Sequence, residues 1–166
     1  MNTILKIAHI NYMSMKPSNK EFIHRTIRVI EQYENIKNKL DCSYSRTLFI
    51  NCCVGLLLLS KEIAYKQLPN KKACVNDWGI DIEKISECLP YISPKQITRH
   101  LRNSISHGNF DFTVEDGLSI PINHINIEDY DKNGNLTFQA LIPFNEFRIF
   151  VLKVSEEALK ILNEKK

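Results

Sequence analysis

The sequence is poor in residues that interrupt a fold, and it has no apolar run long enough to cross a membrane. Five glycines and six prolines occur among 166 residues, which excludes collagen-like chains and Pro/Gly-rich disordered chains. The most apolar run, residues 48–59, includes Asn51, whereas a bilayer span needs about 20 apolar residues. Near the start, Lys6, His9 and Asn11 interrupt the apolar stretch. We therefore expect a cytoplasmic protein with no signal peptide and no membrane contact.

Metal-binding patterns are also missing. No two cysteines are spaced as Cys-x-x-Cys, and no histidine lies near them at zinc-finger spacing. The cysteines are odd in number, and two of them are adjacent inside the apolar run, where a thiol behaves as a small hydrophobe. We interpret all five as free thiols of a reducing compartment, and we predict no bound metal and no cofactor. The five positions are Cys42, Cys52, Cys53, Cys74 and Cys88.

The overall charge is a weak guide to partners. Lys and Arg number 22, Asp and Glu number 19, and the net charge is +3. A charge this small does not identify a polyanion partner unless the basic residues are clustered. The length fits a single domain over residues 1–166, which is large enough to bury a core without a metal or a disulfide.

Apolar residues at three- and four-residue spacing predict four principal helices packed as a bundle. A further helical spacing occurs over residues 3–13, within an N-terminal segment of residues 1–18. The second principal helix is apolar nearly all round, so it should occupy the centre of the bundle. The first has a polar stripe that either faces solvent or contacts a polyanion: Arg25, Arg28, Gln32, Asn35 and Lys39. The predicted principal helices span residues 20–40, 44–67, 94–107 and 143–163.

The segments between the helices have other patterns. Before the third helix, the spacing of Ile82, Ile85 and Cys88 predicts a short helix. Residues 110–142 alternate apolar and polar side chains, and the Asn-Gly pair at 133–134 is a hairpin signal. We therefore predict a mainly α fold, namely a four-to-five-helix bundle with a small antiparallel β-hairpin inserted before the last helix.

The third predicted helix has clear ends and a sharply divided surface. Ser93 is a suitable N-cap, Pro94 fits the first position and Gly108 is a natural stop. On an ideal helix, one side carries three aliphatic residues and the other carries cationic and titratable groups with no carboxylate among them. The alternative is a solvated surface helix, although such helices usually carry Lys and Glu. The aliphatic residues are Ile97, Leu101 and Ile105, and the polar ones are Arg99, His100, Arg102, Asn103, Ser106 and His107.

This polar cluster has the groups that phosphate chemistry requires. Arg binds phosphate through two parallel hydrogen bonds and keeps its charge, and His takes and returns a proton near neutral pH. His107 lies in the last turn, where the helix dipole favours the imidazolium, and Asn103 lies four residues earlier on the same face. Arg102 is about 140° from His107 on an ideal helix. The two therefore converge only if Arg102 curls round the helix or a second copy of the helix approaches.

Such a set suits attack by an RNA 2′-hydroxyl on its own phosphate. One group removes the hydroxyl proton and a cation stabilises the pentavalent oxyanion, so no metal is required. The sequence has no Gly-x-Ser-x-Gly elbow and no glycine-rich phosphate loop. The residues therefore favour a metal-independent endoribonuclease that leaves a 2′,3′-cyclic phosphate.

The run Arg102-Asn103-Ser104-Ile105-Ser106-His107 resembles the signature of HEPN domains, which is an Arg, a polar residue and a His after four to six intervening positions. The Gly after the His, the motif near the end of the penultimate helix and the β insertion before the last helix are similar to stand-alone prokaryotic HEPN proteins. The resemblance covers roughly residues 20–163. It implies a homodimer whose two motifs line one cleft, and a toxin or a defence effector against phage and plasmids.

Within this resemblance, Arg102 and His107 are the catalytic pair and Asn103 orients them. From helix geometry we add Arg99, His100 and Ser106 as candidates for contact with RNA phosphate. In the branch silenced by a nucleotidyltransferase antitoxin, a Tyr follows the His after one residue, where this sequence has Asn109. We therefore expect no adenylylation by such a partner, although another antitoxin remains open. The alternatives are a non-catalytic RNA- or nucleotide-binding module and a protein-interaction scaffold.

Overall fold

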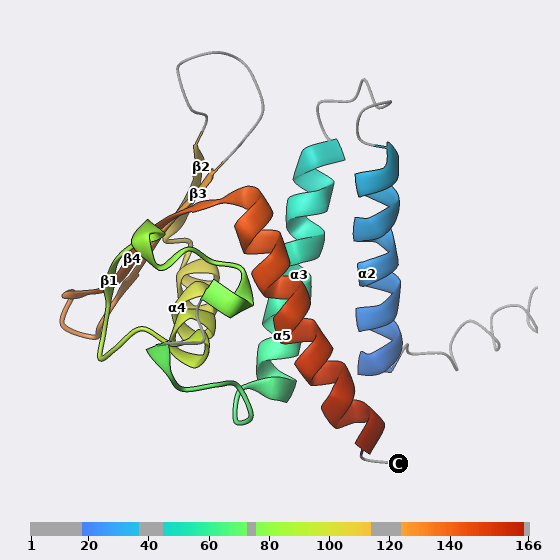
Figure 1. Cartoon of the computed structure of the whole chain (residues 1–166). Coiled ribbons are helices and arrows are strands. Elements are labelled where there is room, and N and C mark those ends of the chain that lie inside the picture. The colour runs from blue at the N-terminus through green and yellow to red at the C-terminus, as the bar shows by residue number, and fades with distance from the viewer. Residues whose placement is uncertain (1–17, 37–44, 73–75, 114–123, 165–166) are drawn as a thin grey trace, which may run out of the picture.

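The chain combines a bundle of helices with a four-stranded sheet (Figure 1). The helices are α2 (Asn19–Ile36), α3 (Ser45–Ala64), α4 (Pro94–His107) and α5 (Phe144–Glu164). The strands are β1 (Ile85–Cys88), β2 (Phe110–Thr113), β3 (His124–Tyr130) and β4 (Leu136–Pro143), and two short 3-10 helices precede β1, η3 (Asn76–Trp78) and η4 (Ile82–Lys84). The computed structural model describes residues 18–36, 45–72, 76–113 and 124–164. The predicted mainly α fold with a β insertion before the last helix is confirmed, whereas the helix predicted over residues 3–13 lies outside the described residues.

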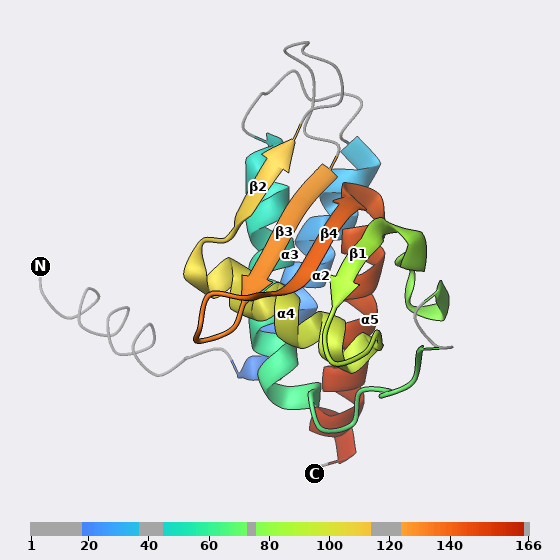
Figure 2. The ribbon, with the colours of Figure 1, turned by 90° about the vertical axis from the view of Figure 1, so that its left-hand side faces the viewer.

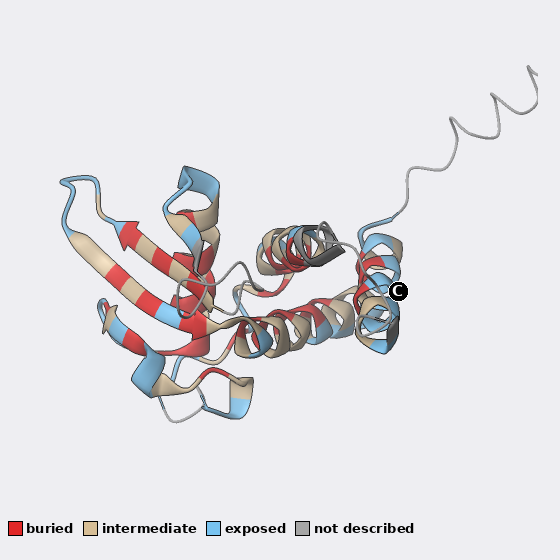
Figure 3. Ribbon diagram, turned by 90° about the horizontal axis from the view of Figure 1, so that it is seen from above, coloured by how far each residue is buried: buried red, intermediate tan, exposed pale blue. Residues whose placement is uncertain are grey.

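Helix α3 lies at the centre of the bundle, as its apolar sequence predicts. It packs against α2, α4 and α5, and Figure 1 shows α2 and α5 running alongside it. Its buried Ser60 hydroxyl donates to the Ser155 hydroxyl of α5 over 3.0 Å, which satisfies a polar group in the core. Viewed from above, buried residues form stripes where the helices and the sheet face one another (Figure 3). None of the described helices is both long and apolar enough to cross a membrane.

The sheet has the strand order β1-β4-β3-β2, and its neighbouring strands are antiparallel. The predicted hairpin is the β3–β4 pair, and Gly134 in its turn has a φ of 81°, a conformation that glycine adopts without steric cost. Asp131 closes the turn by accepting backbone hydrogen bonds from Asn133 and Asn135. The sheet is therefore larger than the predicted hairpin, because β2 of the insertion and β1, which precedes α4, pair with its two edges.

The short helix predicted around Ile85 and Cys88 is wrong. The chain forms one 3-10 turn, η4, and then strand β1. Ile85 pairs with Ala140 and Cys88 pairs with Phe138, so four residues of β1 lie opposite three residues of β4 through a bulge. The bulge turns both Ile85 and Cys88 towards the core. It thereby produces a three-residue spacing of buried positions, which in sequence resembles the period of a helix.

Helix α4 begins and ends where its sequence predicts. Ser93 is the N-cap, and its hydroxyl accepts a hydrogen bond from the backbone N–H of Gln96 over 3.2 Å. Pro94 is the first helical residue. Gly108 ends the helix with a φ of 75°, and its N–H reaches the carbonyl of Ile105. The last helix begins at Phe144 rather than Pro143, because Pro143 is still part of β4.

Candidate functional site

Helix α4 lies between the sheet and the helical bundle, and it positions every residue of the predicted site. It packs on β3 on one side and on α3 on another, and Figure 2 shows it crossing the end of β3. Ile97 and Leu101 of its aliphatic stripe are fully buried, and Ile105 is half-buried. On one side of this stripe the polar residues of α4 are covered by the sheet, and on the other side they lie at the surface. The polar residues therefore form two groups.

His100 lies inside the protein rather than on the polar surface that helix geometry predicts. Its ring is 1% exposed and stacks on Phe138 of β4, with 5.0 Å between the ring centroids. Its Nδ1 is 2.8 Å from the Asp129 carboxylate, and its Nε2 is 2.9 Å from the Leu89 carbonyl. The difference arises because β3, β4 and the segment after β1 cover this flank of α4. Where it lies, His100 joins α4 to the sheet and has no surface open to RNA.

Arg99 belongs to the same buried junction. Its Nη2 donates to the Leu89 carbonyl over 3.1 Å and lies 3.0 Å from His100 Nε2. Its Nε is buried and has no hydrogen-bond partner among the described residues. A neutral His100 ring accepts the Arg99 hydrogen at Nε2, and a protonated ring donates to Leu89 instead. The Arg99 guanidinium is therefore fixed through Nη2 to Leu89, the residue that follows the edge strand β1.

Asp129 of β3 links this junction to the sequence motif. Its carboxylate oxygen Oδ2 accepts from His100 Nδ1 and also from Asn103 Nδ2, which is 3.3 Å away. The other oxygen accepts the backbone N–H of Tyr130 over 3.1 Å. Asp129 is 5% exposed, and a buried carboxylate is stable when its oxygens are hydrogen-bonded in this way. Asn103 is half-buried, and its hydrogen bond to the buried Asp129 fixes the position of its side chain.

Sequence reasoning missed Asp129, although a signal for it was present. Ile125 and Ile127 alternate as inward-facing residues of β3, and continuing the alternation places Asp129 on the same buried face. A carboxylate at an inward position requires a hydrogen-bonding partner. The identity of that partner depends on how β3 crosses α4, which the alternation alone does not indicate.

Arg102, Ser106 and His107 form the second group and lie at the surface. The Arg102 side chain is 38% exposed, and its Nε lies 3.8 Å from Oε1 of Glu62 in α3. The same oxygen accepts from Lys61 Nζ over 3.0 Å. The cationic cluster therefore has a carboxylate beside it after all, supplied by a distant part of the chain. Ser106 and His107 are exposed.

Within one chain, the structure does not bring Arg102 and His107 into contact. The two lie five residues apart on α4, which is about 7.5 Å along a helix axis and about 140° around it. Arg102 turns towards α3, whereas the His107 ring has no hydrogen-bond or ion-pair partner in the described part of the chain. His107 is in the last helical turn, one residue before the Gly108 cap.

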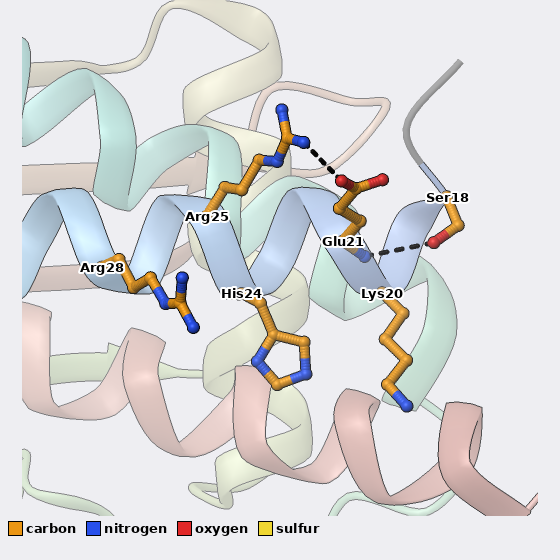
Figure 4. Close-up of a pocket in the computed structure, with 6 residues that line it drawn as sticks. All are labelled: Ser18, Lys20, Glu21, His24, Arg25 and Arg28. Carbon is orange, nitrogen blue, oxygen red and sulfur yellow. Dashed lines mark hydrogen bonds and ion pairs between the residues drawn. The ribbon is translucent and has the colours of Figure 1, made fainter. Parts of the chain in front are cut away.

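The polar stripe of α2 forms a separate basic surface. Figure 4 shows Lys20, His24 and Arg28 on one side of the helix, at four-residue intervals, whereas Arg25 turns away and pairs with Glu21. These residues and Ser18 line a shallow hollow. Of the predicted stripe, Arg25, Arg28, Gln32 and Asn35 are exposed on α2, which packs against α3 and α5, whereas Lys39 lies outside the described residues. Both interpretations of it, a solvated face and a polyanion contact, are compatible with this exposure.

The described residues offer neither a cluster of metal ligands nor a reactive thiol. No group of three or more His, Cys, Asp or Glu gathers there at metal-binding distance. Cys52, Cys53 and Cys88 are free thiols. Burial raises the pKa of Cys53 to about 12 and the pKa of Cys88 to about 11, so neither is a ready nucleophile near neutral pH.

Comparison with known proteins supports the resemblance seen in the sequence. Residues 11–165 match the family model described as HEPN pEK499 p136, so the match includes all of the helices and strands described above. A search of curated proteins and a search of solved structures each found no match.

Proposed function

The chain belongs to the HEPN pEK499 p136 family, and from that premise we propose that it is a metal-independent endoribonuclease. In the proposed reaction, the ribose 2′-oxygen attacks the adjacent phosphorus and the bond to the 5′-oxygen breaks. The 2′-hydroxyl proton goes to a base, and an acid protonates the leaving oxygen. The products carry a 2′,3′-cyclic phosphate and a 5′-hydroxyl.

Arg102 and His107 have the chemistry that this reaction requires. The Arg102 guanidinium keeps its charge at all relevant pH values and stabilises the negative charge that develops on the phosphate oxygens. Histidine is the side chain that most often transfers protons in general acid–base catalysis, and the proposal gives this role to His107. Asn103 lies between them in sequence, and its hydrogen bond to the buried Asp129 gives this face of α4 a fixed geometry.

A two-fold homodimer would complete the site. The reaction needs a base and an acid at the same time, and one exposed His107 per chain supplies a single proton-transfer group. Two α4 helices facing each other across a two-fold axis place two His107 rings and two Arg102 side chains around one phosphate. In this dimer, the angle of about 140° between Arg102 and His107 is no obstacle. The Arg102 of one subunit and the His107 of the other can approach the same phosphate from opposite sides.

The observation that carries the proposal is the exposure of Arg102 and His107 beside an Asn103 fixed from within the core. Purified protein is incubated with total RNA, with and without EDTA, and the product ends are analysed. We expect cleavage that EDTA does not reduce, with cyclic phosphate ends. Arg102→Ala and His107→Ala should each abolish it while light scattering shows an unchanged dimer. The controls are Lys84→Ala and Lys132→Ala, exposed residues of η4 and of the β3–β4 turn, which should retain the wild-type kcat, and wild-type cleavage by either motif variant contradicts the proposal.

A non-catalytic RNA- or nucleotide-binding module is the second candidate. It is favoured by Arg102, which contacts Glu62 and does not contact His107. In that case the motif residues hold a phosphate without chemistry, and RNA binding persists without turnover. A fall in affinity with rising salt then shows that phosphate contacts contribute to the binding.

We also propose a biological role as a toxin or defence effector that a protein partner controls. An endoribonuclease with an open site in the cytoplasm would damage the RNA of its own cell. Expression should therefore arrest growth, and Arg102→Ala or His107→Ala should relieve the arrest. Equal arrest by wild-type and variant protein shows that toxicity does not come from the motif.

A further inference from the structure

Next to the motif, two lysines from different helices converge on one aromatic ring. Lys61 of α3 and Lys95 of α4 each place Nζ 5.1 Å from the centroid of the Tyr65 ring. Each contact is a cation–π interaction, in which the electron-rich face of the ring attracts the ammonium. Each ammonium lies 5.1 Å from the same centroid, so the two like charges are within about 10 Å of each other, and an anion bound near both lowers their mutual repulsion.

This cluster is continuous with the motif. Lys61 Nζ lies 3.0 Å from Glu62 Oε1, and Arg102 Nε lies 3.8 Å from the same atom. On α4, Lys95 precedes Arg102 by seven residues, which is about two turns, so the two side chains leave the same side of the helix about 10 Å apart. A strand bound at Arg102 therefore has both lysines as near neighbours, Lys61 through the shared Glu62 and Lys95 two turns away on α4.

A hollow of about 380 Å³ lies at the end of α3, and Lys61, Tyr65, Lys66 and Gln67 are among the residues that line it. Among the described residues that line it, Glu62 is the one acidic residue and Ile63 and Ile161 are apolar, whereas Lys95 is not part of the lining and joins the cluster through the Tyr65 ring. The size suits one nucleotide unit of an extended strand. Its lining combines ammonium groups, which bind phosphate as point charges, with amide and phenol groups that hydrogen-bond to ribose.

We infer that Lys61, Lys66 and Lys95, arranged around Tyr65, form a subsite for the phosphate backbone of the RNA strand that flanks the bond cut at Arg102 and His107. This inference rests on the proposed function, which it extends from the cleaved phosphate to its neighbours along the strand. The subsite binds the phosphate backbone and does not recognise the bases. Its charged groups are lysines, which act as point charges and lack the planar pair of donors with which arginine recognises a base edge. An acidic segment of a protein partner is the other occupant that such a surface could take, and the test separates the two.

The test measures binding of a fluorescent single-stranded RNA of about ten nucleotides, with every 2′-hydroxyl methylated so that it cannot be cut, and of a dinucleotide of the same chemistry. Affinity is measured by anisotropy over a range of salt concentrations. For Lys61→Gln/Lys95→Gln we expect about tenfold weaker binding of the longer RNA, and a salt dependence lower by about 1.4 in log–log slope, since each phosphate contact on a single strand contributes about 0.7. Binding of the dinucleotide, which reaches only the motif, should change much less, and the small effect comes from Lys61, which shares Glu62 with Arg102.

The matched control is Lys84→Gln/Lys132→Gln, which removes two exposed lysines from η4 and from the β3–β4 turn. It should leave both the affinity and the salt slope at wild-type values. Lys66→Gln gives a second test that leaves the Tyr65 ring contacts intact, and it should lower the slope by about 0.7. Thermal unfolding of each variant verifies that the fold is retained.

Several outcomes overturn the subsite. Equal slopes for wild-type and the Lys61/Lys95 variant overturn it, as does an equal loss in the control variant or for the dinucleotide. If RNA binding depends on Lys61 and Lys95 but wild-type protein does not cut RNA, the subsite stands and the nuclease proposal fails. If wild-type protein cuts RNA but the slope does not change, the nuclease proposal stands and the subsite fails. Absence of RNA binding overturns both and leaves the acidic protein segment as the occupant to test.

Discussion

Asp129 on β3 holds Asn103 of the motif through a hydrogen bond of 3.3 Å from Nδ2 to Oδ2. The same oxygen accepts from His100 one turn earlier on α4. One buried carboxylate therefore fixes both the position of the helix on the sheet and the direction of the Asn103 side chain. The β insertion thus contributes to the candidate site, although it supplies none of the motif residues.

Asp129→Asn should reduce both stability and cleavage. The amide cannot satisfy His100, Asn103 and the Tyr130 N–H at once, because one carboxylate oxygen is replaced by a donor. We expect the free energy of unfolding to fall by about 1–3 kcal/mol and kcat to fall about tenfold, as for a misplaced catalytic group, with KM little changed. Urea unfolding and single-turnover cleavage measure the two effects.

A double-mutant cycle separates positioning of the motif from general stability. In an Asn103→Ala background, Asp129→Asn should still lower the free energy of unfolding, because one amide oxygen cannot replace the two carboxylate oxygens that accept from His100 and from the Tyr130 N–H. It should no longer lower kcat, since the side chain that Asp129 positions is gone. If Asp129→Asn lowers kcat equally in both backgrounds, Asp129 does not act through Asn103.

Glu62→Gln should strengthen RNA binding. The Glu62 carboxylate lies 3.8 Å from Arg102 and 3.0 Å from Lys61, so it repels a phosphate that approaches either cation. Removing one charge at such a distance in a water-like medium is worth roughly 1 kcal/mol, or about a fivefold gain in affinity. The free energy of unfolding should hardly change, because the Glu62 side chain is 59% exposed. Anisotropy titration with a non-cleavable RNA measures the gain, Glu83→Gln in η4 is the control, and weaker binding would mean that Glu62 positions Arg102 for RNA.

The ends of α4 could be predicted from the sequence because they depend on local chemistry. Ser93, Pro94 and Gly108 act through their own backbone conformation and hydrogen bonds to residues within one turn. The apolar stripe of the helix could also be predicted, because Ile97 and Leu101 are buried whichever neighbour covers them.

The burial of His100 could not be predicted, because it depends on contacts between parts of the chain that are distant in sequence. An ideal helix places His100 and His107 within about 20° of each other, yet the sheet covers one and leaves the other exposed. Glu62 reaches Arg102 from another helix by the same kind of contact. In β1, the bulge gives Ile85 and Cys88 the spacing of a helix, so the period of the buried residues was itself misleading.

Gly79→Ala should be much more destabilising than Gly134→Ala. Both glycines have positive φ, 88° and 81°, so an alanine at either position costs about 1 kcal/mol in backbone strain. At Gly79, however, an added Cβ would lie 2.3 Å from Cγ2 of Ile149 in α5, whereas at Gly134 no atom lies within 4 Å of it. Overpacking adds about 1–3 kcal/mol at Gly79 alone. Urea unfolding of the two variants measures the difference, and equal losses would show that α5 yields to the methyl group.

Cys88 should make the protein less stable in alkali. Its thiol is buried near the Tyr91 carbonyl, and this burial raises its pKa from 9.0 to about 11. Because the pKa of this thiol is higher in the folded state than in the unfolded state, its protonation stabilises the fold. This stabilisation is fully present below pH 9 and is lost as the pH rises towards 11. The free energy of unfolding should therefore fall by roughly 2 kcal/mol on this account between neutral pH and about pH 10.5. Cys88→Ser, which does not titrate, should remove that part of the decline in urea unfolding measured at each pH, and parallel pH curves for the two proteins would contradict the assignment.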